Sequence, residues 1–356
     1  MPKLDRYLLS DFTQSFLATL IVLLVVSVGG VMVNILGDIA SGSVPARLLF
    51  SQVGLQFISY LPLILPLALL LGLMLAFSRL YRDSEMAVIT AMGVGPVRML
   101  RPLAGLVVPV VAVVALCSLW LGPLAQRVSS RMIDDANRNT VVTGLDAGHF
   151  TALNDGGVVY VADMSADGAT LGHVFMQRQK DGRLDVVTSK SGLLYFEGDR
   201  QRFLKLQDGF RVEGPLNDTD LDFRLMRFAS NEVALPDRKA AGDDDPELKT
   251  TSELLHASDA PSKAQLHSRL ASPLIALALA LLTLPLSRAS PRQQRYGRIM
   301  LGFLVYLAAI NLMILGNRLI ATGKLSPDLG LWWLTLPLLA AAVWMYLRDG
   351  RLGRSA

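Results

Sequence analysis

The chain has 356 residues, a mean hydropathy of +0.42 and 52% hydrophobic residues, a composition too apolar for an ordinary water-soluble protein. Its formal net charge is only +4, but residues 124–267 carry 17 Lys/Arg against 23 Asp/Glu, whereas the rest of the chain carries 17 against 7. The basic residues outside that block are spread over short loops at the ends of apolar runs. This distribution indicates contact with a membrane surface and argues against nucleic-acid binding.

Six apolar runs approach the ~20 residues that a helix needs to cross a bilayer. They cover residues 16–36, 53–77, 102–121, 270–286, 299–319 and 331–347. We therefore predict a polytopic α-helical membrane protein with six transmembrane helices, three within residues 1–123 and three within residues 268–356. Residues 1–15 are predicted to form a separate interfacial helix, because their leucines and phenylalanines recur on one stripe.

The placement of arginines predicts the orientation of these helices. Residues 78–101 and residues 288–298, the loops after the second and fourth spans, each carry four arginines, and the loops on the other side carry few. By the positive-inside rule, both termini and these two loops are expected in the cytoplasm. The block 124–267 then lies outside the cytoplasm, which means the periplasm in a bacterium with two membranes.

The polar block 124–267 is predicted to be an inserted all-β domain. Short alternating runs are separated by turn dipeptides at the spacing typical of a sandwich or barrel. The runs are Val158–Val161, Leu184–Thr188, Leu193–Phe196, Phe203–Leu206 and Leu221–Phe228. Residues 126–139 look helical and would link the third span to the first strand. Cys117 is the only cysteine, so no disulfide can form within the chain.

Signatures of catalysis are missing from the sequence. His149, His173, His256 and His267 show no metal-ligand spacing, and neither a nucleophile elbow nor a metalloprotease motif occurs. The chain also lacks the glycine-rich loop that binds nucleotide phosphates. We therefore expect no catalytic residue, metal or cofactor on this chain, and no ATP hydrolysis by the chain itself.

The loop at residues 78–101 contains the most informative stretch. Acidic and polar residues open an apolar run that ends at Gly93, an order typical of a short helix. Such a helix under the membrane would fit a groove on a cytosolic partner, with Glu85 accepting a hydrogen bond from a partner arginine and two apolar residues filling depressions. The alternative is a helix that merely rests in the lipid interface. The predicted coupling residues are Asp83, Ser84, Glu85, Met86 and Ile89.

Several segments resemble the lipopolysaccharide export permease family, LptF/LptG. They are Gly42–Pro45 (GSVP), Leu65–Leu69 (LPLAL), Leu80–Met86 (LYRDSEM) and the segment from Pro285 to Gln293 (PLS…PRQ). The resemblance covers the whole chain, and the last segment is most similar to the LptF branch. No single motif is specific; their order within a layout of three spans, a domain and three spans carries the resemblance.

The resemblance implies both an architecture and a function. Members of the family pair as a heterodimer of LptF and its paralogue LptG, bind two copies of the ATPase LptB, which holds the ATP and Mg, and associate with LptC. They extract lipopolysaccharide from the inner membrane and pass it to a periplasmic bridge. The resemblance therefore implies a transmembrane subunit of an ABC transporter, whose central domain is a periplasmic β-jellyroll.

Two sets of residues are expected to meet this substrate. Lipid A carries phosphates, so positive charge is expected at the rim of a cavity open to the outer leaflet. The rim candidates are Asn34, Arg47, Asn311, Asn317, Arg318 and Lys324; the alternative is snorkelling basic residues and asparagines that join helices. Strand alternation predicts a β-jellyroll lining of Val159, Leu204, Leu206, Phe223 and Leu225, which would hold acyl chains or form a plain packed core.

Two other functions remain open from the sequence. One is a non-transporting inner-membrane scaffold whose periplasmic β-domain recruits envelope proteins. The other is a membrane-embedded enzyme acting on lipid, which the missing catalytic motifs disfavour. Copurification separates them, because a transport subunit should bring down an ATPase, whereas a scaffold or an enzyme need not.

Overall fold

The computed structural model describes residues 3–40, 44–138, 147–152, 157–165, 170–180, 183–197, 201–215, 223–235, 245–288 and 296–351. The chain divides into two compact units. The helical unit comprises Met1–Ile35, Phe50–Ser129 and Asp243–Ala356, and the β unit comprises Leu36–Leu49 and Ser130–Gly242. Parts of two family-like segments, residues 42–43 and 291–293, lie outside the described residues.

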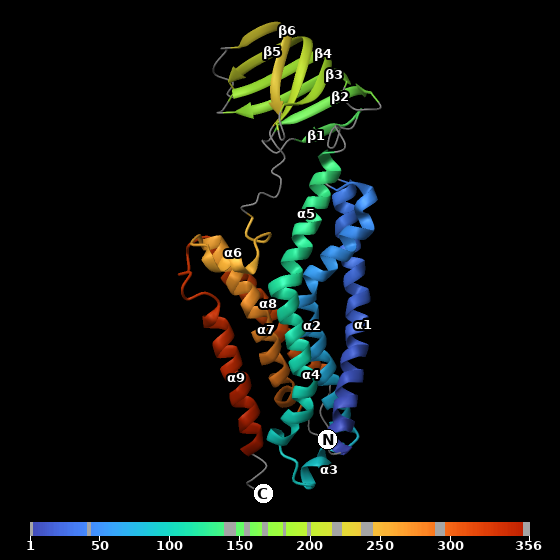
Figure 1. The fold of residues 1–356 in the computed structure, drawn as a ribbon, viewed down its shortest axis with the longest axis vertical. Helices are drawn as coiled ribbons and strands as arrows, with labels where there is room; N and C mark the ends of the chain where they lie inside the picture. Colours follow the sequence, from blue (N-terminus) through green and yellow to red (C-terminus); the bar gives the residue numbers. More distant parts are fainter. Residues whose placement is uncertain are drawn as a thin grey trace. The chain divides into compact units, whose positions relative to one another are not determined.

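The helices follow the predicted spans (Figure 1). They are α1 (Lys3–Ala40), the 3-10 turn η1 (Ala46–Leu48), α2 (Leu49–Arg82), α3 (Glu85–Ala91), α4 (Pro96–Leu116), the π-helical turn η2 (Cys117–Leu121), α5 (Gly122–Arg138), α6 (Thr251–His256), α7 (Ala260–Ser287), α8 (Tyr296–Ala321) and α9 (Trp332–Arg351). The helix predicted for residues 126–139 is confirmed by α5.

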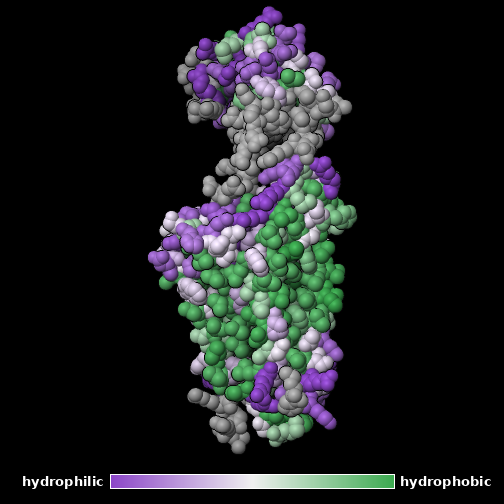
Figure 2. Space-filling model, viewed as in Figure 1, coloured by the Kyte–Doolittle hydropathy of each residue, from purple (hydrophilic) through white to green (hydrophobic). Residues whose placement is uncertain are grey.

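Five helical segments of the described chain are long and apolar enough to cross a membrane: Lys3–Ala40, Ala46–Arg82, Val97–Ala136, Ala260–Ser287 and Gly297–Ala321. The sixth predicted span is also helical, as α9, but its three tryptophans, Pro337 and charged end make it less apolar than the others. Figure 2 shows a broad apolar belt over the helical unit, with polar side chains at its ends. The predicted polytopic membrane architecture is confirmed.

One prediction for the N-terminus is wrong: α1 is a single continuous helix, without a separate interfacial helix at residues 1–15. The stripe that includes Leu8, Phe12 and Phe16 packs into the core of the helical unit instead of facing lipid. Gly72 of α2 makes this contact possible, because a Cβ there would lie 2.7 Å from the Cα of Phe16. Because lipid tails are as apolar as these side chains, close van der Waals packing stabilises this contact more than removal from water does.

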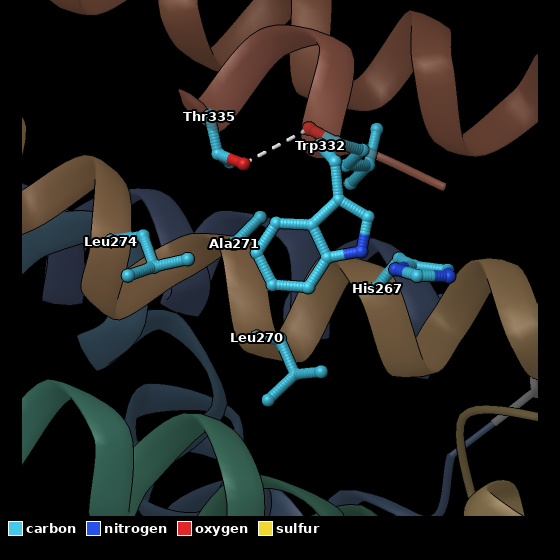
Figure 3. Close-up of a pocket in the computed structure, with 7 residues that line it drawn as sticks. His267, Leu270, Ala271, Leu274, Trp332 and Thr335 are labelled. Carbon is cyan, nitrogen blue, oxygen red and sulfur yellow. Dashed lines mark hydrogen bonds between the residues drawn. The ribbon is translucent and has the colours of Figure 1, made fainter. Parts of the chain in front are cut away.

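The loop before α9 is fixed against α7. In Figure 3 the Trp332 indole lies over Ala271, and the His267 ring stands edge-on to it, with ring centroids 6.2 Å apart. The Nε2 of His267 lies 3.1 Å from the Pro327 carbonyl oxygen. Gly330 has a φ of +52°, and a Cβ at this position would come within 2.3 Å of the His267 ring. His267 therefore has a packing role at the start of α9.

The β unit contains one antiparallel sheet in sequential strand order. Its strands are β1 (Phe150–Ala152), β2 (Val158–Met164), β3 (Thr170–Lys180), β4 (Arg183–Glu197), β5 (Gln201–Pro215) and β6 (Arg224–Leu235). The predicted inserted all-β domain is confirmed. Its described strands run up and down within a single sheet, and the crossovers of a jellyroll are not among the described connections.

In each strand from β2 to β6, one residue is passed over in the pairing with the neighbouring strands. These residues form a line across the sheet, which we call the crease. The residues passed over in the pairing of neighbouring strands are Ala162, His173, Lys190, Asp208 and Ala229. Two of them, His173 and Asp208, have left-handed backbone angles, with φ of +48° and +52°. The extra residue in each strand shifts the inward–outward alternation of side chains by one position. Successive inward-facing residues are therefore three positions apart in sequence at the crease, as with Leu206 and Gly209.

The crease decides which predicted lining residues face inward. Val159, Leu204 and Leu206 are buried in one apolar cluster of the sheet. Phe223 and Leu225 are 60% and 68% exposed and do not line this interior. Simple alternation along β6 from the inward-facing Val233 would have turned Leu225 inward, but the extra residue at the crease turns it outward.

A buried arginine anchors the return of the chain into the helical unit. Arg269 of α7 is only 4% exposed and donates to the carbonyls of Lys249 at 2.9 Å and Glu247 at 3.0 Å. It also donates to the Thr251 hydroxyl, which in turn donates to the Leu119 carbonyl within η2. A π-helical turn leaves backbone groups without their usual partners, so this contact compensates for the irregular turn.

Helix α6, which follows the segment held by Arg269, has a capping box formed by Thr250 and Glu253. The Thr250 hydroxyl accepts from the Glu253 N–H at 3.3 Å, and the Glu253 carboxylate accepts from the Thr250 N–H at 2.6 Å. This backbone donor holds the pKa of Glu253 below its usual range. Arg127 of α5 donates to Glu253 and to the Leu248 carbonyl. The outgoing α5 and the returning segment are thereby joined within the helical unit.

Changing Arg269 to Met should lower the free energy of unfolding by about 2–4 kcal/mol, because buried carbonyls lose their donors. Thermal unfolding in detergent would measure the loss. The matched control is Lys263→Met on the same helix, whose ion pair with the exposed Asp328 spans 3.8 Å and should contribute under about 1 kcal/mol. Equal losses in the two variants would contradict the anchoring role of Arg269.

Candidate functional site

The helix predicted in the loop between the second and third spans is confirmed as α3. It begins after Ser84, whose φ of +58° turns the chain sharply out of α2. It ends at Gly93, whose N–H donates to the Thr90 carbonyl at 2.9 Å, while the Val94 N–H donates to the Ile89 carbonyl at 3.2 Å. This pair of bonds is the Schellman motif, and Gly93 supplies the left-handed residue it needs, with φ of +80°.

Two of the predicted contact residues on α3 face their own chain. Met86 and Ile89 are buried in the core that contains Leu80 and Met99. They cannot fill depressions on a partner while they fill this core, and the prediction of that role is corrected. Their burial fixes α3 firmly against α2 and α4.

The residues that α3 presents outward are Val88 and Met92, which are 59% and 62% exposed. Val97, at the start of α4, is exposed close by in sequence. Sequence reasoning missed them because it assigned the outward role to Met86 and Ile89 without establishing which face of the helix packs against the rest of the chain. Helical periodicity held the signal: if Met86 and Ile89 share the buried face, Val88 and Met92, four residues apart, share another.

The acidic residues at the start of α3 have partners within the chain. Glu85 is half-buried, and its Oε2 accepts a hydrogen bond of 2.8 Å from the Tyr7 hydroxyl of α1. A carboxylate offers about four acceptor positions, so Glu85 can also accept from an outside donor. Asp83 and Arg82 form an exposed ion pair with an N–O distance of 2.7 Å.

The rim candidates on α8 do not all face the same way. Asn311 and Arg318 are exposed and lie two turns apart on one face, as their seven-residue spacing requires. Asn311 donates to the Leu307 carbonyl of its own helix at 2.8 Å. Lys324 is exposed in the loop after α8, whereas Asn317 is half-buried.

The two remaining rim candidates belong to other elements of the chain. Asn34 is exposed near the end of α1. Arg47 belongs to the β unit and donates to the Ala136 carbonyl of the same unit at 3.2 Å. The described structure therefore places Asn311 and Arg318 on one face of α8, Lys324 in the loop that follows, and the other candidates on other faces or elements.

A polar cavity of about 240 Å³ lies within the helical unit, room for several water molecules. Amide, hydroxyl and charged side chains line much of it, among them Gln126, Gln265, Ser268, Arg269 and Asn317. The Oδ1 of Asn317 is buried there without a hydrogen-bond partner among the described residues. Burial raises the pKa of the lining residue Glu247, and Asp245 adds to the rise while Arg269 opposes it.

No group of three metal-binding side chains occurs among the described residues. The described residues provide three candidate site features, which are a short helix with an exposed apolar face, a basic helix end and a cavity with polar lining residues. Such features are suited to binding other molecules.

The two faces of α3 should respond differently to the same substitution. Met86→Glu should destabilise the helical unit by about 3 kcal/mol or more, because it buries an uncompensated charge. Val88→Glu should change stability by no more than about 0.5 kcal/mol, since position 88 is exposed. Unfolding midpoints of the two purified variants provide the measurement, and equal midpoints would refute the assignment of the faces.

Comparison with known proteins identifies relatives along nearly the whole chain. The family described as lipopolysaccharide export system permease LptF/LptG matches residues 6–348. The lipopolysaccharide export system permease protein LptF of Escherichia coli (strain K12) is 30% identical over 350 residues, which cover 97% of this chain and 94% of that protein. LptF of Shigella flexneri matches to the same extent. The chain belongs to the lipopolysaccharide export permease family LptF/LptG.

Proposed function

We propose that the chain is the transmembrane subunit of an ATP-driven ABC transporter that extracts lipopolysaccharide from the inner membrane and passes it to the periplasmic Lpt bridge. Its membership of the permease family supports the substrate. The sequence contains no phosphate-binding loop, so the energy has to come from a partner. Two copies of the ATPase LptB, with their ATP and Mg, are the proposed source.

The proposed assembly pairs this chain with the LptG paralogue and adds LptC. The start of α1, the end of α9 and α3 lie at the same end of the helical unit (Figure 1), which supports an orientation with all three on the cytoplasmic side. The arginines of residues 78–101 favour the same orientation by the positive-inside rule. The β unit then functions in the periplasm.

The observation that carries the proposal is the exposed face of α3. Val88 and Met92 are one helical turn apart, the spacing of anchors that enter a groove on a partner. Because Met86 and Ile89 pack in the core of the helical unit, α3 is already fixed in place, and docking costs little conformational entropy. Glu85 stands at the start of the helix, where its remaining acceptor positions suit a charge-assisted hydrogen bond from an arginine of the ATPase.

The substrate proposal assigns the lipid phosphates to the outer end of α8. Arg318 and Asn311 form an exposed polar face on an otherwise apolar helix, and Lys324 follows in the next loop. The inward residues of the β unit, including Val159 and Leu204, are fully buried by one another. Acyl chains could enter there only if the sheet opened, so this role requires a conformational change.

ATPase docking should depend on the outward residues of α3. Val88→Glu or Met92→Glu should reduce copurifying ATPase by about tenfold or more, because a charge would enter an apolar contact. Glu85→Ala should also weaken docking, whereas the conservative Val88→Ile should retain it. A full complement of ATPase on both glutamate variants would reject α3 as the docking element, whereas a parent chain that brings down no ATPase would favour the scaffold alternative.

Lipid contact at α8 should depend on Arg318. Neutralising it as Arg318→Gln should lower lipopolysaccharide photocrosslinking by about tenfold, because a hydrogen bond to a charged group is worth about 1.5–3 kcal/mol. Lys263→Gln, which removes an exposed charge already paired with Asp328, is the matched control and should crosslink normally. Unchanged crosslinking in Arg318→Gln would assign this residue to membrane snorkelling.

A further inference from the structure

Three polar contacts join the start of α1 to the segment that holds α3. The Tyr7 hydroxyl donates to Glu85, the first residue of α3. Asp11 forms an ion pair with Arg79 in the last turn of α2, and Asp5 forms one with Arg98 in the first turns of α4 at 3.3 Å. These three partners of α1 lie immediately before, at and after α3.

The acidic residues of these pairs are buried, although they lie on a helix long and apolar enough to cross a membrane. Asp5 is 5% exposed and Asp11 is 3% exposed, while the side chains of Arg79 and Arg98 remain nearly half exposed. A buried carboxylate is costly unless it is paired, so each aspartate is held to its arginine. Leu8 and Phe12 fill the same face of α1 with apolar contacts to the core.

The rest of α1 is packed very differently. Beyond Phe16 most of its side chains are exposed in the helical unit, as with Val25 at 69% and Val33 at 68%. The boundary between the two halves lies where Phe16 crosses Gly72 of α2 at backbone contact distance. The closely packed part of α1 therefore ends at this helix crossing, and beyond it only Val31 and Ile35 are buried.

We propose that residues Lys3–Phe16, here called the α1 base, form one rigid block with α3, and that displacement of α3 turns the exposed half of α1 about the Phe16–Gly72 crossing. The α1 base thus positions α3 and carries its movement into the membrane. The inference rests on the proposed function, because a docked ATPase supplies the displacement. Tyr7, Asp5 and Asp11 act as positioning residues, because each acts through its partner on the segment that holds α3.

The experiment measures the movement of α1 directly in the complete transporter. Spin labels are placed on cysteines introduced at Val25 of α1 and Leu312 of α8, both exposed, with the single native cysteine Cys117 replaced by alanine. The labelled complex, with its ATPase, is compared in lipid nanodiscs without nucleotide and after trapping with ATP and vanadate. The distance between the labels should change by about 2–5 Å, the range of helix shifts in switching proteins.

Variants of the α1 base separate rigid coupling from mere packing. Asp11→Asn is nearly isosteric and leaves the half-exposed Arg79 accessible to water, so the chain should still fold and bind ATPase. The nucleotide-dependent distance change should fall to half or less, and lipopolysaccharide export per ATP hydrolysed should fall with it. Tyr7→Phe, which removes one hydroxyl, should give a smaller reduction, and it serves as the second variant if Asp11→Asn fails to fold. Arg6→Gln, on the exposed side of the same helix, is the control and should behave as the parent.

The result also distinguishes this inference from the proposed function. An ATPase that copurifies with every variant, together with an undiminished distance change in Asp11→Asn and Tyr7→Phe, would overturn the rigid block and leave the docking proposal intact. A parent complex with ATPase bound but no distance change would likewise overturn the lever. Failure of the parent chain to bind ATPase would instead reject the proposed function on which the inference rests.

Discussion

Buried charge needs a partner, and this constraint shapes both ends of the helical unit. At one end Arg269 donates hydrogen bonds to backbone carbonyls of the returning chain. Through Thr251, the same side chain also joins α7 to the π-helical turn. At the other end Asp5 and Asp11 are buried on α1 and are paired with arginines of α4 and α2. Between these ends the packing is mostly apolar, apart from contacts such as the hydrogen bond from the Tyr306 hydroxyl to the Leu63 carbonyl at 2.8 Å, and most of α1 beyond Phe16 is exposed. The buried charges at the two ends add directional contacts that fix the chain there.

Most of the architecture could be predicted from the sequence, because hydrophobic length and turn residues act locally. The predicted spans, the short helix ending at Gly93 and the all-β insert depend on such local signals. The prediction of a separate interfacial helix at residues 1–15 was wrong, because no proline or glycine breaks α1 where that helix was expected to end. Tertiary packing also buries the apolar stripe that includes Leu8 and Phe12. Strand β3 was missed since its polar residues and His173 obscure the alternation.

The candidate site was harder to predict, since it depends on which face of an element meets the rest of the chain. The sequence identified α3 but gave Met86 an outward role, whereas Met86 is buried in the core that contains Leu80 and Met99, and Val88 is exposed. In the β unit the crease inserts one residue in each strand from β2 to β6, which turned Leu225 outward. Tyr7 and Glu85, which share a side-chain hydrogen bond, are 78 residues apart in sequence, so no local sequence pattern predicts the contact.

We propose that the outward face of α3, together with its C-cap Met92, receives the energy for lipopolysaccharide export from an ATPase. A photoreactive amino acid placed singly at each position from 85 to 92, in cells that make the whole transporter, tests this proposal. The account predicts crosslinks to the ATPase from positions 88 and 92 and none from positions 86 and 89, whose side chains face the chain's own core. Crosslinks to lipid alone from positions 88 and 92 would contradict it.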